Sequence, residues 1–175
     1  VPVASPIGNN RVRALFEDSR GRLWIGRHGC MFVRENGHFR GLPGDPEHPL
    51  TDVRAFAEDR DGALWAIGKQ GLVRITNDRI EAVALPNLPQ KVNLLSLHAD
   101  ADGALWIGAE SLGLVRYERG NVFVYTAAHA LPTISIGAIV EEKDWLWLAG
   151  DKGLVRVSRQ SLDAVAAGHT ALLEL

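Results

Sequence analysis

The stretch ADADGALWIG, residues 99–108, decides the fold, because its acidic turn and its tryptophan recur along the chain at one fixed interval. The tryptophans that share this context are 41 residues apart, at Trp24, Trp65, Trp106 and Trp147. An acidic residue stands six positions before each of them, at Asp18, Asp59, Asp100 and Glu141. Features that recur in register at such a period indicate a tandem-repeat protein. The chain therefore contains four copies of one unit.

The second copy shows what one unit contains. Its β-compatible runs lie at residues 53–58, 64–67, 72–75 and 79–84. The first two runs flank the turn-forming residues 59–62, which predicts a hairpin. Gly62 supplies the positive φ that a tight hairpin turn requires, and Asp59 can accept hydrogen bonds from the backbone of the same turn. Each unit therefore predicts four short antiparallel strands.

The fold class that these units predict is all-β, namely a β-propeller or propeller fragment with four blades of four antiparallel strands. No segment shows helical periodicity over ten or more residues. A single sheet cannot bury two apolar faces alone, so we expect the copies to stack face to face with the tryptophans between them. The expected units are residues 11–51, 52–92, 93–133 and 134–170, joined by Pro- and Gly-bearing loops such as residues 41–49.

The composition indicates a folded domain, with 46% hydrophobic and 23% charged residues. A net charge of −2 with both signs interspersed gives no basic surface for nucleic acid or for an anionic membrane. No run approaches the roughly 20 apolar residues that span a bilayer, so we expect no direct membrane contact by this segment. The first residues, VPVASPIGNN, contain no signal peptide, and the last, HTALLEL, resemble the start of a further copy. We therefore expect the segment to be excised from a longer protein.

Several residues invite a search for metal or catalytic sites. The closely spaced carboxylates of Asp100 and Asp102 suit calcium, but no bidentate glutamate follows them, so a hairpin turn is the favoured interpretation. None of the six histidines stands three to five residues from another, which argues against a zinc site. Cys30 is the only cysteine, has no catalytic context and is expected to fill buried space. We predict no metal, no cofactor and no catalytic residue.

Arginines recur on or near the third strand of each unit, at Arg34, Arg74, Arg116 and Arg156. They are compatible with an anion-binding ring or with ion pairs between blades. Ion pairing is favoured, because these residues recur with the repeat and do not converge on one loop.

Specificity is expected from positions at which the copies differ. In propellers, the loops that lead into the inner strand and the loops between the second and third strands lie on one face, which is a rigid scaffold for polar groups. The polar residues of these loops form the predicted ligand-binding rim: Arg11, Arg13, His28, Asp52, Arg54, Lys69, Gln70, Lys91, Asn93 and Glu110.

The string acidic-x-x-Gly-x-Leu-Trp-Ile-Gly, followed by Gly-Leu-x-Arg, resembles the two-component regulator propeller repeat. It reads EDSRGRLWIG at residues 17–26 and ADADGALWIG at residues 99–108, and the resemblance covers all four units. It implies seven-bladed propellers, often two in tandem, in the extracytoplasmic sensor region of membrane-bound signalling proteins with histidine kinase or diguanylate cyclase outputs. It also implies a periplasmic location, and a partner that is either an unknown small molecule, with carbohydrates as the family expectation, or a protein domain.

The chain departs from that repeat in three ways. The fourth copy reads EEKD at residues 141–144 in place of Asp-x-x-Gly, so we expect a distorted hairpin or an aspartate in the left-handed region. The first copy has Cys30-Met31 in place of Gly-Leu. The copies number four and not seven. Either four blades close a small ring, or the open arc pairs with a second chain, giving a homodimer that completes the propeller and covers its exposed edges.

Three classes of function follow from these observations. The leading one is a non-catalytic extracytoplasmic sensor module that binds a ligand or a partner domain. The second is a protein-interaction or dimerisation scaffold without a small-molecule ligand. The third is a propeller enzyme such as a lyase or glycosidase, which would require paired carboxylates about 5 to 9 Å apart at the mouth of the channel.

Overall fold

The computed structural model describes residues 11–42, 52–89 and 91–175. It divides into two compact units, Val1–Val83 and Ala84–Leu175, each of which contains two antiparallel sheets. His48, the unit boundary at residue 51 and most of the loop at residues 41–49 lie outside the described residues.

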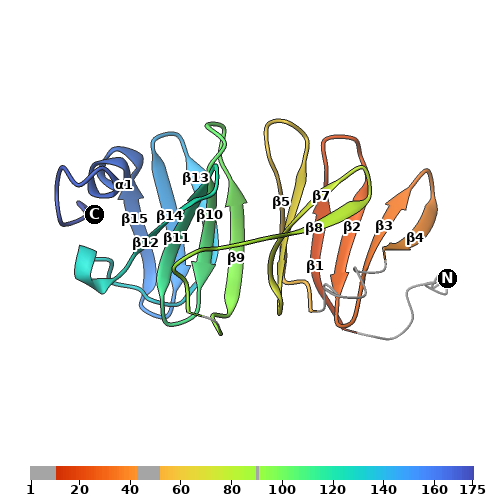
Figure 1. Ribbon diagram of the computed structural model, residues 1–175, viewed down its shortest axis with the longest axis horizontal. Coiled ribbons are helices and arrows are strands. Elements are labelled where there is room, and N and C mark those ends of the chain that lie inside the picture. The colour runs from red at the N-terminus through yellow and green to blue at the C-terminus, as the bar shows by residue number, and fades with distance from the viewer. Residues whose placement is uncertain (1–10, 43–51, 90) are drawn as a thin grey trace. The chain divides into compact units, whose positions relative to one another are not determined.

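In each sheet the strands are adjacent in sequence order, and successive strands are antiparallel (Figure 1). The first unit contains β1 (Val12–Glu17), β2 (Leu23–Arg27), β3 (Met31–Glu35) and β4 (His38–Leu42), then β5 (Ala55–Glu58), β6 (Leu64–Gly68), β7 (Gly71–Thr76) and β8 (Arg79–Val83). The second unit contains β9 (Leu94–Ala99), β10 (Leu105–Ala109), β11 (Gly113–Glu118), β12 (Asn121–Tyr125), the 3-10 helix η1 (Ala127–His129), β13 (Ile136–Glu142), β14 (Trp145–Gly150), β15 (Gly153–Ser158) and the helix α1 (Arg159–Ala166). The predicted all-β fold with four repeated sheets is confirmed.

The fourth repeat differs from the prediction, because its sheet has three strands and α1 stands where a fourth strand was expected. Ser158 caps the helix by accepting the backbone N–H of Ser161 at 3.1 Å, and Leu162 and Val165 share its buried side. The hydroxyl of buried Tyr125 donates to the carbonyl of Leu162 at 2.9 Å, and burial raises the pKa of that hydroxyl to about 12. The serine cap and the apolar residues at helical spacing therefore favour a helix over the strand that the repeat predicts at this position.

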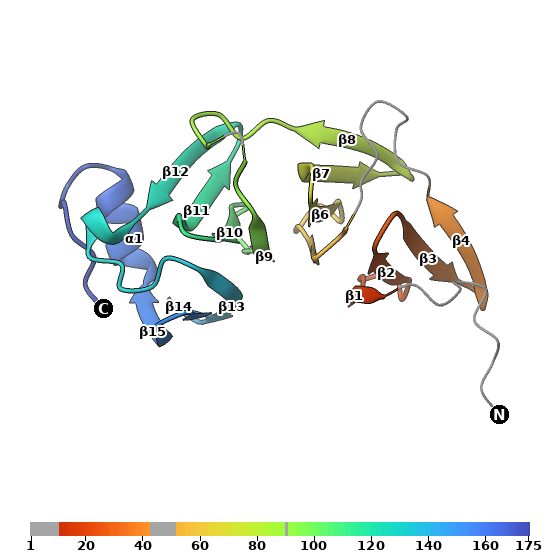
Figure 2. The same cartoon turned by 90° about the horizontal axis from the view of Figure 1, so that it is seen from below.

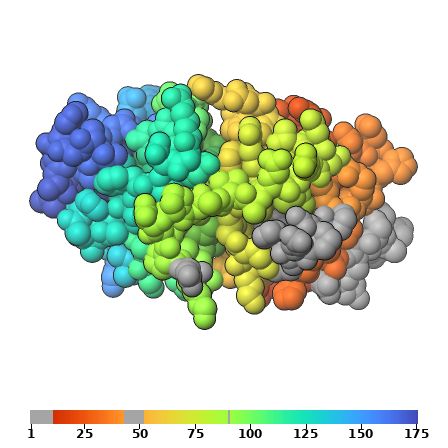
Figure 3. All heavy atoms as spheres, viewed as in Figure 1, coloured from red at the N-terminus to blue at the C-terminus, as the bar shows by residue number. Residues whose placement is uncertain are grey.

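The segment after α1 packs against the second unit. Leu173 is 6% exposed, and its backbone N–H donates to the carbonyl of His129 at 2.9 Å. This segment and α1, blue in Figure 3, lie at the surface of the second unit.

The turns of the first three repeats match the prediction, since Gly21, Gly62 and Gly103 have φ of 72°, 76° and 95°. The fourth turn is neither distorted nor built on a left-handed aspartate. Glu142 pairs with Trp145 in a regular hairpin, and Lys143 takes the positive φ of 54°. A two-residue turn needs left-handed backbone early in the loop, which moves that conformation from Asp144 to Lys143.

Each unit has one apolar core between its two sheets, and Figure 2 shows the sheets of each unit from another side. In the first unit Trp24 contacts Phe56, with ring centroids 6.4 Å apart. In the second, Trp106 packs with Leu146 and Leu148. The sheets approach so closely that a Cβ at Gly108 would overlap the carbonyl oxygen of Ile136. The tryptophans therefore fill the layers between sheets, as predicted, in the first and third repeats.

Trp106→Ala tests this packing. Trp106 is 0% exposed, so its removal leaves a large cavity and should lower the free energy of unfolding by about 3 to 5 kcal/mol. Urea unfolding followed by circular dichroism measures the loss. Leu172→Ala is the control, because Leu172 is 54% exposed and should change stability by less than about 0.5 kcal/mol. Equal stability of Trp106→Ala and the parent chain would contradict the assignment of Trp106 to the core.

Candidate functional site

The repeated aspartate fastens the repeated tryptophan to its own turn. The indole Nε1 donates to the Oδ2 of Asp18, Asp59 and Asp100 at 2.8, 2.8 and 2.7 Å in the first three repeats. The other carboxylate oxygen of Asp100 accepts the backbone N–H groups of Asp102 and Ala104, both at 2.9 Å. The carboxylate is thereby occupied by protein donors, which agrees with the hairpin interpretation of the acidic turns.

The fourth repeat shifts this bond by one position. Trp147 Nε1 donates to Glu142 at 2.9 Å, and Glu141, the expected partner, contacts other groups. Its carboxylate lies 3.1 Å from His98 Nε2 and 3.0 Å from the Arg159 guanidinium. The change in the turn therefore makes one carboxylate available to a different part of the second unit.

The repeated arginines mainly stack on the repeated tryptophans within their own sheet. Arg74, Arg116 and Arg156 lie 5.5, 5.4 and 5.6 Å from the ring centroids of the tryptophans opposite them on the neighbouring strand. The favoured prediction of ion pairs between blades was therefore incomplete. Arg116 does form an ion pair with Asp163 of α1 at 2.6 Å, but the shared contact is cation–π. Cys30 is partly exposed and not the buried filler that the sequence suggested.

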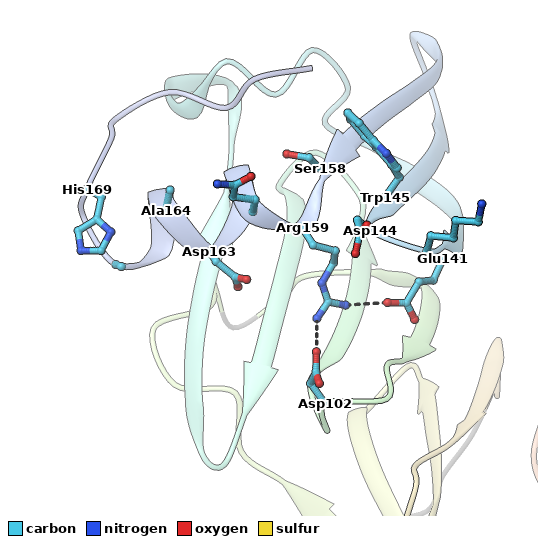
Figure 4. Close-up of a pocket in the computed structure, with 12 residues that line it drawn as sticks. Asp102, Glu141, Asp144, Trp145, Ser158, Arg159, Asp163, Ala164 and His169 are labelled. Carbon is cyan, nitrogen blue, oxygen red and sulfur yellow. Dashed lines mark hydrogen bonds and ion pairs between the residues drawn. The ribbon is translucent and has the colours of Figure 1, made fainter.

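A cleft of about 850 Å³ opens beside α1 in the second unit (Figure 4). Its walls come from the β9–β10 turn, the β13–β14 hairpin, the end of β15, α1 and the residues that directly follow α1 in the sequence. The lining residues are Asp102, Glu141, Lys143, Asp144, Trp145, Ser158, Arg159, Gln160, Asp163, Ala164, Ala167 and His169.

Arg159 organises the floor of this cleft. Figure 4 shows its guanidinium between Asp102 and Glu141, at 3.2 and 3.0 Å. The same group lies 2.7 Å from Asp100, whose side chain is fully buried, and 5.2 Å from the ring centroid of Trp106. Only 12% of the Arg159 side chain is exposed. Three carboxylates therefore converge on one guanidinium, which holds the turn, the hairpin and the helix together.

These contacts keep Asp100 ionised. Burial alone would raise the pKa of its carboxyl, but the hydrogen bonds from Trp106 and the backbone of Ala104, together with the charge of Arg159, outweigh burial and lower the pKa below 3.8. The pKa of Asp18 is lowered in the same way, because burial raises it but the hydrogen bonds from Trp24 and Arg22 and the charge of Arg22 outweigh burial. The floor of the cleft is thus a set of fixed charges.

The cleft lies where the fourth repeat departs from the others. The equivalent position in the first unit, lined in part by Trp24, Asp61 and Asn77, holds a cavity of only about 90 Å³. There the chain turns at Asn77 and continues into β8, whereas after Ser158 it enters α1. The shorter β13–β14 turn and the helix together widen the space. The expectation that specificity lies where copies differ therefore leads to this cleft.

The lining is suited to binding a polar ligand. Asp102 is 84% exposed on its side chain, and half-buried Trp145 offers ring surface, with Arg156 lying 4.1 Å from its centroid. Ser158 carries the hydroxyl group of the lining, and its oxygen accepts the backbone N–H of Ser161 at the start of the helix. In the part of the chain that the structure describes, no three His, Cys, Asp or Glu side chains are placed to hold a metal ion. Arg159 forms ion pairs with the three carboxylates that converge on the floor.

The predicted rim residues fall into small groups that tie loops to neighbouring strands. In the first unit, Asp52 lies 2.6 Å from Arg13 and 3.5 Å from Arg54, and its backbone is left-handed with φ 61°. His28 donates its backbone N–H to the carbonyl of Arg11 at 3.4 Å. Lys69 and Gln70 are exposed in the β6–β7 turn.

In the second unit, Asn93 donates its side-chain amide to Glu110 at 2.6 Å, and Lys91 is exposed nearby in the sequence. Asp151 occupies the same repeat position as Glu110 and accepts from Thr133 and from the backbone of Ile134 and Ser135. These hydrogen bonds lower the pKa of Asp151. The role of the rim in ligand binding stays a prediction.

Sequence reasoning missed Arg159, Trp145 and the cleft that they line. Two signals were present: the EEKD turn without glycine at residues 141–144, and the run SRQSLDAVAA at residues 158–167, in which a serine precedes apolar residues at helical spacing. The contact of Arg159 with Asp100 joins residues far apart in the sequence, and the repeat pattern alone does not indicate it.

The fold and the repeated Asp–Trp units define an all-β segment of the propeller class. The family described as "Two component regulator propeller" matches residues 6–26, which confirms the resemblance seen in the sequence. Among proteins with curated descriptions, none matches the chain in sequence.

Solved structures share the fold at low sequence identity. The extracellular domain of a putative hybrid two component system from B. thetaiotaomicron is 18% identical, with a TM-score of 0.71 over 87% of this chain and 24% of that one. A catalytically inactive virginiamycin B lyase from Staphylococcus aureus is 17% identical, with a TM-score of 0.69 over 98% and 56%. The computationally designed Ika4 protein is 16% identical, with a TM-score of 0.63 over 86% and 92%. The chain thus spans about a quarter of the length of its two-component relative.

No helix among the described residues has the length and the apolar character needed to cross a membrane.

Asp100→Asn tests the charge network under the cleft. Because the pKa of Asp100 is lower in the folded than in the unfolded chain, its contribution is present above about pH 4 and is lost as the pH falls through the folded value. At pH 7 the variant should lose about 3 kcal/mol of unfolding free energy, and its difference from the parent chain should shrink at acidic pH. Urea unfolding over a pH series measures both.

Asp61→Asn is the matched control, since Asp61 is an exposed aspartate in the equivalent turn of the second repeat. It should change stability by less than about 0.5 kcal/mol at each pH. A difference between Asp100→Asn and the parent chain that does not vary with pH would contradict the proposed ionisation.

Proposed function

We propose that this segment is the non-catalytic sensory part of a membrane-bound bacterial signalling protein, located in the periplasm, and that it binds its ligand in the cleft beside α1. The observation that carries the proposal is the cleft itself, built on a fixed floor of ionised groups at the place where the repeats diverge. The match to the regulator propeller family supports the regulatory role. The output, a histidine kinase or a diguanylate cyclase, belongs to the rest of the parent protein.

The ligand class proposed for the cleft is a neutral carbohydrate. Carboxylates such as Asp102 and Asp144 accept hydrogen bonds from sugar hydroxyl groups, and Lys143 and Gln160 donate them. Trp145 provides an apolar ring surface against which the C–H groups of a sugar can pack. A few placed polar groups beside an aromatic side chain are the usual composition of a small-molecule site.

A second candidate function is a dimerisation scaffold. It is favoured by one observation, the exposed apolar side chains on the outer face of the fourth sheet, where Leu154 is 66% exposed.

Isothermal titration of the chain with a panel of neutral mono- to tetrasaccharides tests ligand binding. At least one sugar should bind, and Trp145→Ala should weaken its binding by about tenfold or more, because an aromatic contact contributes about 0.5 to 1.5 kcal/mol beyond the area that it buries. Lys69→Ala is the control that separates the cleft from the predicted rim, since Lys69 is exposed in the first unit.

Three results would count against the cleft: no binding by any sugar of the panel, binding that Trp145→Ala leaves unchanged, or binding that Lys69→Ala abolishes. The signalling role has a separate test. The complete gene should encode a membrane-spanning segment followed by a kinase or cyclase domain.

A further inference from the structure

The 3-10 helix η1 begins with a capping box whose third helical residue is a histidine. The side chain of Thr126 accepts the backbone N–H of Ala128 at 3.2 Å, and Nδ1 of His129 accepts the backbone N–H of Thr126 at 3.1 Å. This position usually holds glutamate or glutamine, whose side-chain oxygen accepts the same backbone N–H. In this helix a titratable ring nitrogen therefore takes the place of that oxygen.

The hydrogen bond fixes the protonation state of the ring. A backbone N–H can only donate, so Nδ1 of His129 carries a lone pair, and the ring is neutral with its proton on Nε2. A protonated imidazole has an N–H group on both nitrogens and cannot accept. Protonation would thus set two donors against each other at the start of η1. Histidine is the side chain that ordinarily changes its charge between about pH 5 and 8, so this cap is sensitive to pH in that range.

The ring of His129 packs against aromatic side chains. Its centroid lies 5.6 Å from that of Phe123 and 6.3 Å from that of Tyr125. Burial raises the pKa of the Tyr125 hydroxyl to about 12, so this group stays neutral over the same range. Arg116 interacts with Tyr125 and pairs with Asp163 of α1 at 2.6 Å. Among the described residues, the side chains that contact the ring directly are therefore uncharged.

The backbone of His129 also holds the segment that follows α1. Its carbonyl accepts the N–H of Leu173 at 2.9 Å, and the Leu173 side chain is buried in the core of the second unit. The next residue is tied to α1, because the N–H of Glu174 donates to the Ser161 hydroxyl at 2.7 Å. The same segment borders the cleft, since His169 is one of the lining residues. The position of η1 thus determines where this segment is attached.

We propose that protonation of His129 opens the capping box of η1 and loosens residues 168–175 from it, so that these residues act as a pH-sensitive latch at the edge of the cleft. The neutral ring is the form that accepts the Thr126 N–H. The latch is therefore closed at neutral and alkaline pH, and it loosens as the pH falls through the range in which the ring gains a proton. This inference does not depend on the ligand or on the signalling role.

Hydrogen exchange of the backbone amides, followed by NMR at pH 8 and at pH 5, tests the latch. The protection factor compares each amide with an unstructured peptide at the same pH, which removes the intrinsic pH dependence of exchange. The protection factor of Leu173 should fall by about tenfold or more from pH 8 to pH 5, the size expected when a partly buried hydrogen bond is lost. The amide of Leu148, in the middle strand of the fourth sheet, should stay protected at both pH values.

His129→Gln should keep Leu173 protected at both pH values, because the amide oxygen accepts the same N–H and takes up no proton. His129→Ala should lower the protection of Leu173 at both, because it removes the acceptor. His169→Gln is the matched control, since it makes the same substitution at the histidine within the segment. It should retain the pH dependence of the parent chain.

Equal protection of Leu173 at pH 8 and pH 5 in the parent chain would overturn the proposal. A pH dependence that His129→Gln retains, or that His169→Gln removes, would assign the effect to another group and would overturn it too. A parallel fall in the protection of Leu148 would show that the whole unit opens, which is also incompatible with a latch. If His129→Ala does not fold, His129→Gln alone decides the outcome.

Discussion

The hydrogen bond from the tryptophan indole to the aspartate six residues earlier is the constraint on which the structure depends. One carboxylate oxygen accepts the indole N–H, and the other accepts two backbone N–H groups of the turn. The ring is therefore fixed relative to its own hairpin by contacts within a single sheet. The arginine of the third strand covers one face of the ring, which leaves the rest of the tryptophan for the core.

Much of the fold could be predicted from the sequence because these interactions are local. The spacing of Asp100, Gly103 and Trp106 encodes a turn, a left-handed glycine and a buried ring within seven residues, and the pattern recurs. Interactions between residues so close in the chain can be recognised from the sequence alone. The α1 helix was missed because its short apolar pattern competes with the strand expected from the repeat, and contacts with Tyr125 favour the helix.

The cleft could not be predicted for a different reason. Its floor depends on the contacts of Arg159 with Asp100 and Glu141. These three residues belong to different elements, and no pattern in the sequence indicates that they lie side by side. Glu141 is free for that contact only because Trp147 bonds to Glu142 in its place. A change of one position in a turn is a weak signal in sequence, yet it decides which carboxylate lies on the floor of the cleft.

The replacement of an outer strand by α1 shows which part of the repeat tolerates remodelling. In each four-stranded sheet the fourth strand has one neighbouring strand, whereas the second and third have two, and the aspartate and tryptophan both lie near the first hairpin. An insertion or exchange at the outer position therefore leaves the aspartate–tryptophan framework of the repeat intact. Repeats of this design can diversify by gaining new elements at their periphery, so differences in recognition among such proteins should map to the ends of their sheets more than to their interiors.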